Sequence, residues 1–524
     1  MNKLVAQLQG VVGVDAVLSD TNSIAFYTND IYSKGSDCIA VIRPDNIADL
    51  QAIVRLCYQQ GVAIFTRGGG VSYTSGYLPN CERSIVIDTV GLNRIVMINE
   101  TDMYVTVETG VTWKQLHEAL AEKGLRTPFW GPFSGVAASV GGTISQHAIS
   151  HGSAMYGGSA DSVISIDVIN GVGEILSTGA AAHINGVPFS RTSGPDLTGL
   201  FCGDCGTLGV KASISLRLIK LPKQQHGLSF KFRDFDSMNA AMAGIARAEL
   251  ADESVGLDPQ FQQNLASQQS IGLQVEIAKA IFRASKNIFS ALYKLTKMAL
   301  NGKAFLEQPG FGANFVLSGM NKAVIDAKIQ ATREIAYQFG DEIPNSMPTV
   351  MITMPFAPLN NILGVQGERW VPINGCMPFS ECKGFHHDWM AVLHRYQSEM
   401  DTQNMFIAGM YSAISTNIFL YEIAFYWQDT RSSFHNTVLD DDYLAGLQTF
   451  SPSPDGRALV ETLRKEAITL WHERGATHLQ LGKAYPFLSS RVPAASKALS
   501  DIKHNMDPQN LFNPGALGFS SNTE

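Results

Sequence analysis

Polar side chains that stand among apolar neighbours are the first candidates for chemistry in this 524-residue chain. Glu422 lies inside the run from Phe419 to Trp427, and all the remaining residues of this run are apolar or aromatic. A buried carboxylate needs a partner or a raised pKa, so Glu422 could act as a base. Because the side chains of a strand alternate between two faces, the same carboxylate could instead face water.

A second group of polar side chains lies in the segment 475–485. Each could contact a substrate if this segment covers a site, although a single histidine is more often a hydrogen-bonded core residue. These candidates are His478, Gln480, Lys483 and Tyr485.

A glycine-rich loop at residues 66–77 follows the apolar run Val62–Phe65, which is typical of a short buried strand. Gly68, Gly69 and Gly70 therefore lie where the strand ends. Without Cβ atoms they can turn successive N–H groups into one concavity, which suits a pyrophosphate. The loop has neither Gly-Lys-Ser/Thr nor G-x-G-x-x-G, so it is not a P-loop or a Rossmann fingerprint, and an ordinary turn is the alternative.

Two further segments rich in glycine and small residues follow, at 130–158 and 201–210. Small side chains would allow each to lie flat against a planar cofactor. The three loops in this order, together with Glu108–Thr112 and the C-terminal Met506–Gly515, resemble the FAD-binding domain of the vanillyl-alcohol oxidase and p-cresol methylhydroxylase flavoprotein family. The resemblance extends over nearly the whole chain.

This resemblance implies an α+β fold of two domains and FAD as the cofactor. Residues 1–220 would form the PCMH-type FAD-binding domain, residues 221–460 a cap of sheet and helices over the substrate, and residues 461–524 a segment that returns to the first domain. The residues expected to bind FAD are Arg67, Gly68, Gly69, Gly70, Val71, Ser72, Tyr73, Pro132, Ser134, Gly141, Gly142, Thr143, Ser145, Tyr156, Gly157, Gly206, Gly209, Val210, Cys376 and Asn513.

The resemblance also assigns candidate roles. Tyr73 falls where phenol-oxidising members carry an active-site tyrosine, and packing beside the loop is the alternative. The histidine that binds flavin covalently in some members is replaced by Cys376, and a second attachment point is replaced by Val71. We therefore expect dissociable FAD, with a thioether through Cys376 as the alternative.

Two features separate this chain from the phenol-oxidising members. Gly475-Ala476 stands where they place a Tyr-Arg pair that stabilises phenolate, and their aspartate near flavin N5 falls on Ser145. We expect an FAD-dependent oxidase or dehydrogenase that acts on an alcohol or an activated C–H bond of a small organic substrate. Oxygen or an electron-transfer partner would be the acceptor, and a homodimer is possible.

Two alternatives remain open at this point. One is a D-2-hydroxyacid or glycolate-type dehydrogenase, although the His-Gly-Glu-His run of those relatives is not matched by His478–Gly482. The other is a non-catalytic partner subunit with a flavin fold.

Composition bounds these readings. With 39 Lys and Arg against 47 Asp and Glu, the net charge of -8 argues against nucleic-acid binding. Residues 1–20 lack the pattern of a signal peptide, and no run reaches the roughly 18 apolar residues of a membrane span. The 7 cysteines, sparse and odd in number, fit a reduced cytoplasmic setting.

No metal site is expected. Cys202 and Cys205 form a lone C-x-x-C, and His386 and His387 have only Asp388 beside them. Residues 271–300 have the pattern of a basic amphipathic helix, for which a solvated face is favoured over peripheral membrane contact. Apolar periodicity further predicts helices at 47–60, 111–124 and 463–473, strands at 85–88, 95–98, 104–107, 349–354 and 417–427, and a hairpin at 164–177.

Overall fold

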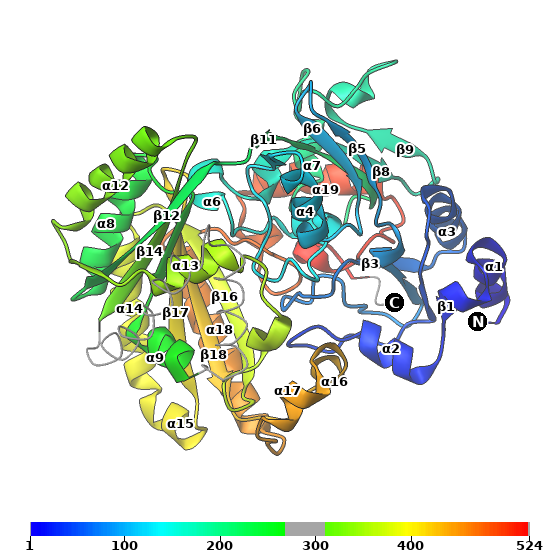
Figure 1. The fold of residues 1–524 in the computed structure, drawn as a ribbon. Coiled ribbons are helices and arrows are strands. Elements are labelled where there is room, and N and C mark those ends of the chain that lie inside the picture. Colours follow the sequence, from blue (N-terminus) through cyan, green and yellow to red (C-terminus); the bar gives the residue numbers. More distant parts are fainter. Residues whose placement is uncertain (1, 268–309, 522–524) are drawn as a thin grey trace.

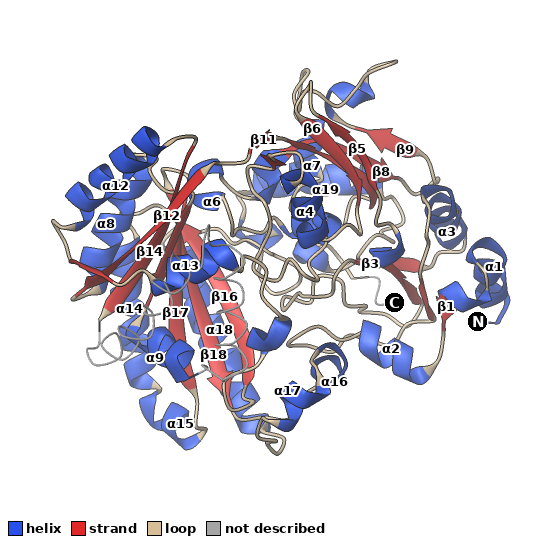
Figure 2. Ribbon diagram, in the orientation of Figure 1, coloured by secondary structure: helices blue, strands red, loops and turns tan. Residues whose placement is uncertain are grey.

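The computed structural model describes residues 2–267 and 310–521. The helix expected over 271–300 lies outside the described residues. Figure 1 shows two bodies side by side: an N-terminal domain with two sheets, and a cap domain built on a third sheet. Figure 2 shows that loops rather than helices or strands fill most of the space where the two bodies meet.

The first sheet of the N-terminal domain has the order β1-β2-β4-β3, in which β2, β4 and β3 are parallel. Helix α3 (Ile47–Gln59) makes the crossover between β2 and β3, which confirms the predicted helix. The Asn46 side chain caps it, and its face Leu50, Ile53, Val54 and Cys57 is buried against the sheet. The strands are β1 (Val17–Leu18), β2 (Ala40–Ile42), β3 (Ala63–Arg67) and β4 (Ser84–Asp88).

The second sheet is antiparallel, with the order β5-β6-β10-β8-β9. The predicted hairpin at 164–177 is confirmed as β8 and β9. Helix α4 (Trp113–Ala121) packs its buried Trp113, Leu116 and Leu120 on this sheet. The strands, with the small pair β7 and β11, are β5 (Ile95–Asn99), β6 (Tyr104–Glu108), β7 (Leu125–Arg126), β8 (Val163–Ile169), β9 (Ile175–Ser177), β10 (Val210–Arg217) and β11 (Ile219–Lys220).

Further helices complete the N-terminal domain. They are α1 (Asn2–Val12), α2 (Thr21–Tyr27), α5 (Val140–Gln146), α6 (Ser153–Tyr156), α7 (Leu197–Leu200) and α19 (Pro493–Met506). Short 3-10 helices occur along the chain at η1 (Val14–Ala16), η2 (Thr89–Gly91), η3 (Ser159–Ser162), η4 (Gly179–Ala182), η5 (Leu359–Ile362), η6 (Leu488–Ser490) and η7 (Ala516–Gly518).

The cap sheet is antiparallel, with the order β15-β12-β14-β13-β17-β18-β16. Its strands are β12 (Gln224–Phe232), β13 (Glu253–Leu257), β14 (Phe311–Gly319), β15 (Asp341–Ile343), β16 (Arg369–Met377), β17 (Phe406–Ile414) and β18 (Ile418–Trp427). Its helices are α8 (Phe235–Arg247), α9 (Pro259–Ser267), α12 (Lys322–Ala336), α13 (Ser346–Thr353), α14 (Cys382–Arg395), α15 (Gln397–Thr402), α16 (Ser433–Val438), α17 (Asp441–Ala445) and α18 (Pro454–Glu473).

One sequence prediction in the cap is wrong. Residues 349–354 are not a strand, because residues 346–353 form helix α13, which packs on β12 and β14. The run Thr349-Val350-Met351-Ile352-Thr353 is rich in β-branched residues and favours a strand locally, but contact with the sheet overrides this preference. The strand predicted at 417–427 is confirmed as β18, and the helix predicted at 463–473 lies within α18.

The end of the chain returns to the first sheet. The N–H of Ile64 donates to the carbonyl of Leu511 at 2.7 Å, and the N–H of Asn513 donates to the carbonyl of Ile64 at 2.9 Å. Residues 511–513 therefore extend the edge of the sheet beside β3, the strand that leads into the first glycine loop.

All seven cysteines are free thiols. Among the described residues, no helix combines the length and the apolar character that a membrane span requires.

Candidate functional site

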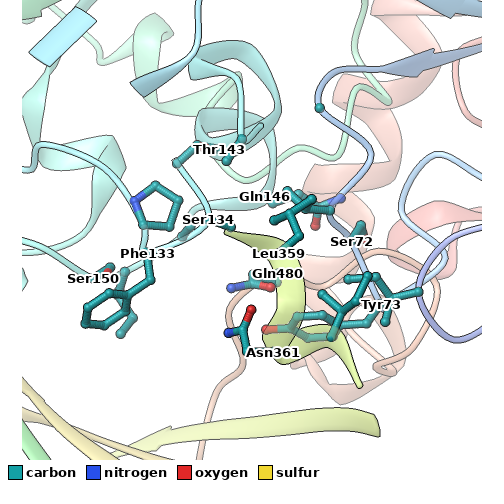
Figure 3. Close-up of a pocket in the computed structure, with 18 of the residues that line it drawn as sticks. Ser72, Tyr73, Phe133, Ser134, Thr143, Gln146, Ser150, Leu359, Asn361 and Gln480 are labelled. Atoms are coloured by element: carbon teal, nitrogen blue, oxygen red, sulfur yellow. The ribbon is translucent and has the colours of Figure 1, made fainter. Parts of the chain in front are cut away.

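A cavity of about 1020 Å³ lies where the two domains meet. On the N-terminal side its wall comes from the three glycine-rich segments. On the cap side it comes from β13, β16, β17, β18, helix α13 and the segment after it. Figure 3 shows Ser72 and Tyr73 of the first loop facing Phe133 and Ser134 of the second across this space.

Backbone hydrogen bonds hold the wall segments together. The N–H of Cys205 donates to the carbonyl of Ser145 at 2.9 Å, and the N–H of Gln480 donates to the carbonyl of Gln146 at 2.8 Å. The N–H of Lys483 donates to the carbonyl of Thr74 at 2.9 Å. The segment 475–485 is thereby fixed against both the first and the second loop.

The first loop presents unpaired N–H groups. The peptide N–H groups of residues 69–72 have no hydrogen-bond acceptor among the described residues, and these residues line the cavity. Gly69 packs so tightly that a Cβ atom would lie 1.8 Å from the carbonyl oxygen of Ala137. Free N–H groups turned into a cavity form an anion-binding nest.

The third loop borders open space in the same cavity. Gly206 has φ of +71°, and a Cβ atom built on it would meet no heavy atom within 4 Å. A side chain there would project into the cavity. The free N–H groups of the first loop and the open surface at Gly206 together fit a long cofactor that carries a pyrophosphate.

Comparison with known proteins agrees with this geometry. Residues 38–179 match the family model described as the FAD binding domain. These residues form an FAD-binding domain. The whole chain has the two-domain PCMH-type fold: it matches the structure of p-cresol methylhydroxylase with substrate bound, at a TM-score of 0.75 and 16% identity, over 100% of this chain and 98% of that one.

Two curated relatives match part of the chain. Glycolate oxidase subunit GlcD of Bacillus subtilis is 29% identical over 211 residues, which are 40% of this chain and 43% of that protein. The mitochondrial D-lactate dehydrogenase (cytochrome) of Arabidopsis thaliana is 29% identical over 261 residues, 48% of this chain and 44% of that protein. The matched region is thus less than half of either relative.

FAD is the cofactor of this domain, and most of the residues predicted to bind it line the cavity. They are Gly68, Gly69, Gly70, Val71, Ser72, Tyr73, Pro132, Ser134, Gly141, Gly142, Thr143, Ser145, Gly206 and Gly209. The others lie behind this wall. The Arg67 guanidinium stacks on the rings of Phe26 and Tyr27, and the ring of Tyr156 lies under Arg126.

Asn513 supports the loops from behind. Its Nδ2 donates to the carbonyls of Gly76 at 2.7 Å and Cys205 at 2.6 Å. Its Oδ1 accepts a hydrogen bond from Lys483 Nζ at 2.8 Å. Val210 is buried in the core at the start of β10, and Gly157, with φ of +85°, follows α6 outside the wall.

Cys376 is also away from the wall. It is buried in a small apolar cluster with Leu420 and Leu479, both of which line the cavity. Burial raises the pKa of the thiol to about 12, which disfavours the thiolate that a covalent flavin link would need.

Three of the predicted catalytic side chains meet at the cavity: Tyr73, Glu422 and Gln480. The Tyr73 ring packs edge-on against Trp370 at 5.6 Å. Burial above all, and then the charge of Glu422, hold the pKa of the Tyr73 phenol well above its usual value, so it remains a hydrogen-bond donor. Figure 3 shows its hydroxyl directed toward Asn361, with Gln480 close by.

Glu422 has a different protonation behaviour. Its side chain is half-buried on β18, faces the cavity, and forms no hydrogen bond or ion pair with any described residue. Because protein surrounds the carboxyl, its pKa rises from 4.5 to about 8. A carboxylic group that titrates near neutral pH inside a cavity is suited to proton transfer.

His478, Lys483 and Tyr485 do not line the cavity. His478 Nδ1 lies 2.6 Å from the carbonyl of Asn374, and the Tyr485 hydroxyl accepts the Asn374 N–H at 2.9 Å. Burial lowers the pKa of His478 to about 4. Lys483 Nζ donates to the carbonyls of Ser75 and Leu78 at 3.2 and 3.0 Å.

Sequence reasoning missed several wall residues. Asn374 lines the cavity, and its Oδ1 accepts the N–H of Leu479 at 3.1 Å. His478 and Tyr485 hold the backbone of Asn374 in place. Helix α13 supplies much of the cap wall. The spacing of its apolar residues Met347, Val350, Met351 and Met354 is that of one helix face and could have indicated a helix here.

Proposed function

We propose that the protein is an FAD-dependent oxidoreductase that oxidises an alcohol, or a related activated C–H bond, of a small organic substrate. One observation carries the proposal: a phenol that stays protonated, Tyr73, and a carboxyl that titrates near pH 8, Glu422, face the cavity that the FAD-binding loops line.

FAD, when bound, accepts a hydride from a substrate carbon. Tyr73 Oη donates a hydrogen bond to the substrate oxygen and orients it. The ionised Glu422 carboxylate takes the hydroxyl proton while the C–H bond gives up its electron pair, so that C–O becomes C=O. His478 and Tyr485 hold the backbone of Asn374, and Gln480 lies beside the Tyr73 phenol. The side chains of Asn374 and Gln480 are therefore positioned to orient the substrate.

The proposed cofactor link is non-covalent. The buried Cys376 thiol, with its pKa near 12, supports this, and so does Val71 at the other family attachment position. The names of the two curated relatives favour a second candidate, the oxidation of a 2-hydroxyacid. Against it stands the sequence His478–Gly482, which lacks the His-Gly-Glu-His run.

Anaerobic titration of the purified holoprotein tests the proposal. Alcohols, phenols and 2-hydroxyacids are added in turn, and bleaching of the flavin absorbance is followed. We expect an alcohol to bleach the flavin, and re-admission of oxygen then separates an oxidase from a dehydrogenase. Bleaching by phenols alone would contradict the interpretation of Gly475-Ala476, and no bleaching by any class would favour a non-catalytic partner subunit.

A further inference from the structure

An apolar compartment forms the cap side of the cavity. Met347, Val350, Met351 and Met354 lie at helical spacing on one face of α13 and the residue after it, and all four line the cavity. Side chains at positions i, i+3, i+4 and i+7 share one face of a helix, so α13 presents a continuous apolar surface.

Other elements close the compartment. Val255 and Leu257 of β13 point into it at period two, and Met410 comes from the neighbouring β17. Phe261 of α9 and Phe133 of the second loop complete its wall. Methionine side chains are flexible and polarisable, so such a wall adapts to apolar chains of different shape.

The cavity wall has no unpaired cationic side chain among the described residues that could bind a carboxylate. Among the described residues that line it, Lys211 is the only cationic side chain, and its Nζ is ion-paired with the buried Asp204 at 2.5 Å. The acidic Glu253 and Glu422 also line it. An anionic group near Glu422 would be desolvated without a partner and repelled at pH values where Glu422 is ionised.

We propose that the substrate has an uncharged reacting end and an apolar chain that occupies this compartment. The inference rests on the proposed oxidation at the same cavity and narrows its substrate class. It excludes short 2-hydroxyacids as the preferred substrates.

Binding of unreactive ligands tests whether the compartment accepts an apolar substrate chain. Straight-chain 2-alkanones of increasing length are added to the holoprotein, and Kd is read from the change in the flavin spectrum. We expect Kd to fall about fourfold for each added methylene until the compartment is filled. At pH 9 the carboxylate of equal length should bind at least about tenfold more weakly. A Kd that is independent of chain length would overturn the inference.

Two substitutions on helix α13 test whether this compartment sets the length dependence. Val350→Phe narrows the compartment and should shorten the longest apolar chain that still gains affinity. Thr349→Phe, on the same helix but outside both the cavity wall and the apolar cluster around Met351, should leave the length dependence unchanged. An equal effect of both variants would contradict the assignment.

Flavin reduction separates this inference from the proposed function. If alkanones follow the length trend but no alcohol reduces the flavin, the apolar compartment is supported and the proposed oxidation is wrong. If 2-hydroxyacids reduce the flavin faster than alcohols of equal length, oxidation is supported and the apolar substrate class is wrong.

Discussion

Replacing Glu422 by glutamine tests the proposed base, because the variant keeps the size of the side chain and cannot take up a proton. With a pKa near 8, about 1% of the wild-type carboxyl is ionised at pH 6 and about 90% at pH 9. The rate of flavin reduction should therefore rise by about two orders of magnitude over this range.

The variant should lose this dependence. We expect Glu422→Gln to reduce the flavin about 10² to 10⁴-fold more slowly at pH 9, which is the usual contribution of a positioned base, and to show a flat profile through pH 8. Anaerobic stopped-flow measurement at saturating substrate gives the rate, and the flavin absorbance of the resting protein confirms that FAD stays bound.

Stability gives an independent measurement of the same group. The folded protein holds the Glu422 proton more tightly than the unfolded chain, because its pKa is raised from 4.5 to about 8. The resulting stabilisation is present below pH 4.5 and is lost as the pH rises to about 8, at about 1.4 kcal/mol per pH unit. Glu422→Gln should thus become more stable than the wild type as the pH rises across this window.

Two results would refute the assignment of Glu422 as the base. One is a wild-type rate of flavin reduction without an inflection between pH 7 and 9, and the other is a Glu422→Gln rate equal to that of the wild type.

The remaining predictions concern the phenol, the loop and the cofactor link. Tyr73→Phe keeps the ring and removes the donor, so flavin reduction should slow by about 10²-fold at unchanged FAD content, and an unchanged rate would assign Tyr73 to packing. Gly69→Ala should abolish FAD retention and lower Tm, because its Cβ would lie 1.8 Å from the carbonyl of Ala137, whereas Gly10→Ala, with nothing within 4 Å, should keep both; equal retention in the two would contradict the loop geometry. Acid precipitation of the wild type should release yellow flavin into the supernatant, as it should for Cys376→Ser, and a yellow pellet found only with the wild type would show a covalent link.

The FAD-binding side of the site could be largely predicted from the sequence. Glycine positions are set by local geometry, so the loops around Gly69, Gly141 and Gly206 could be recognised one by one, and the structure places all three on one cavity. That Tyr73 and Glu422 lie at one cavity could not be read from either segment, because Tyr73 is in a loop of the N-terminal domain and Glu422 is on β18 of the cap.

The cap side was harder to predict. Residues 349–354 favour a strand by composition and form part of a helix through contacts with β12 and β14. The role of Asn374 was hidden because its partners His478 and Tyr485 lie about a hundred residues away. Cys376 was predicted to contact flavin from its position in the family pattern. Apolar neighbours enclose it, and these come from segments distant in the sequence that no local pattern reveals.

Asn513 has a consequence for biosynthesis. Its amide ties down the carbonyl of Gly76, which precedes it by 437 residues. On the ribosome, the glycine turns emerge long before the residue that clamps them, so we expect the nascent polypeptide to capture flavin only after Asn513 has emerged.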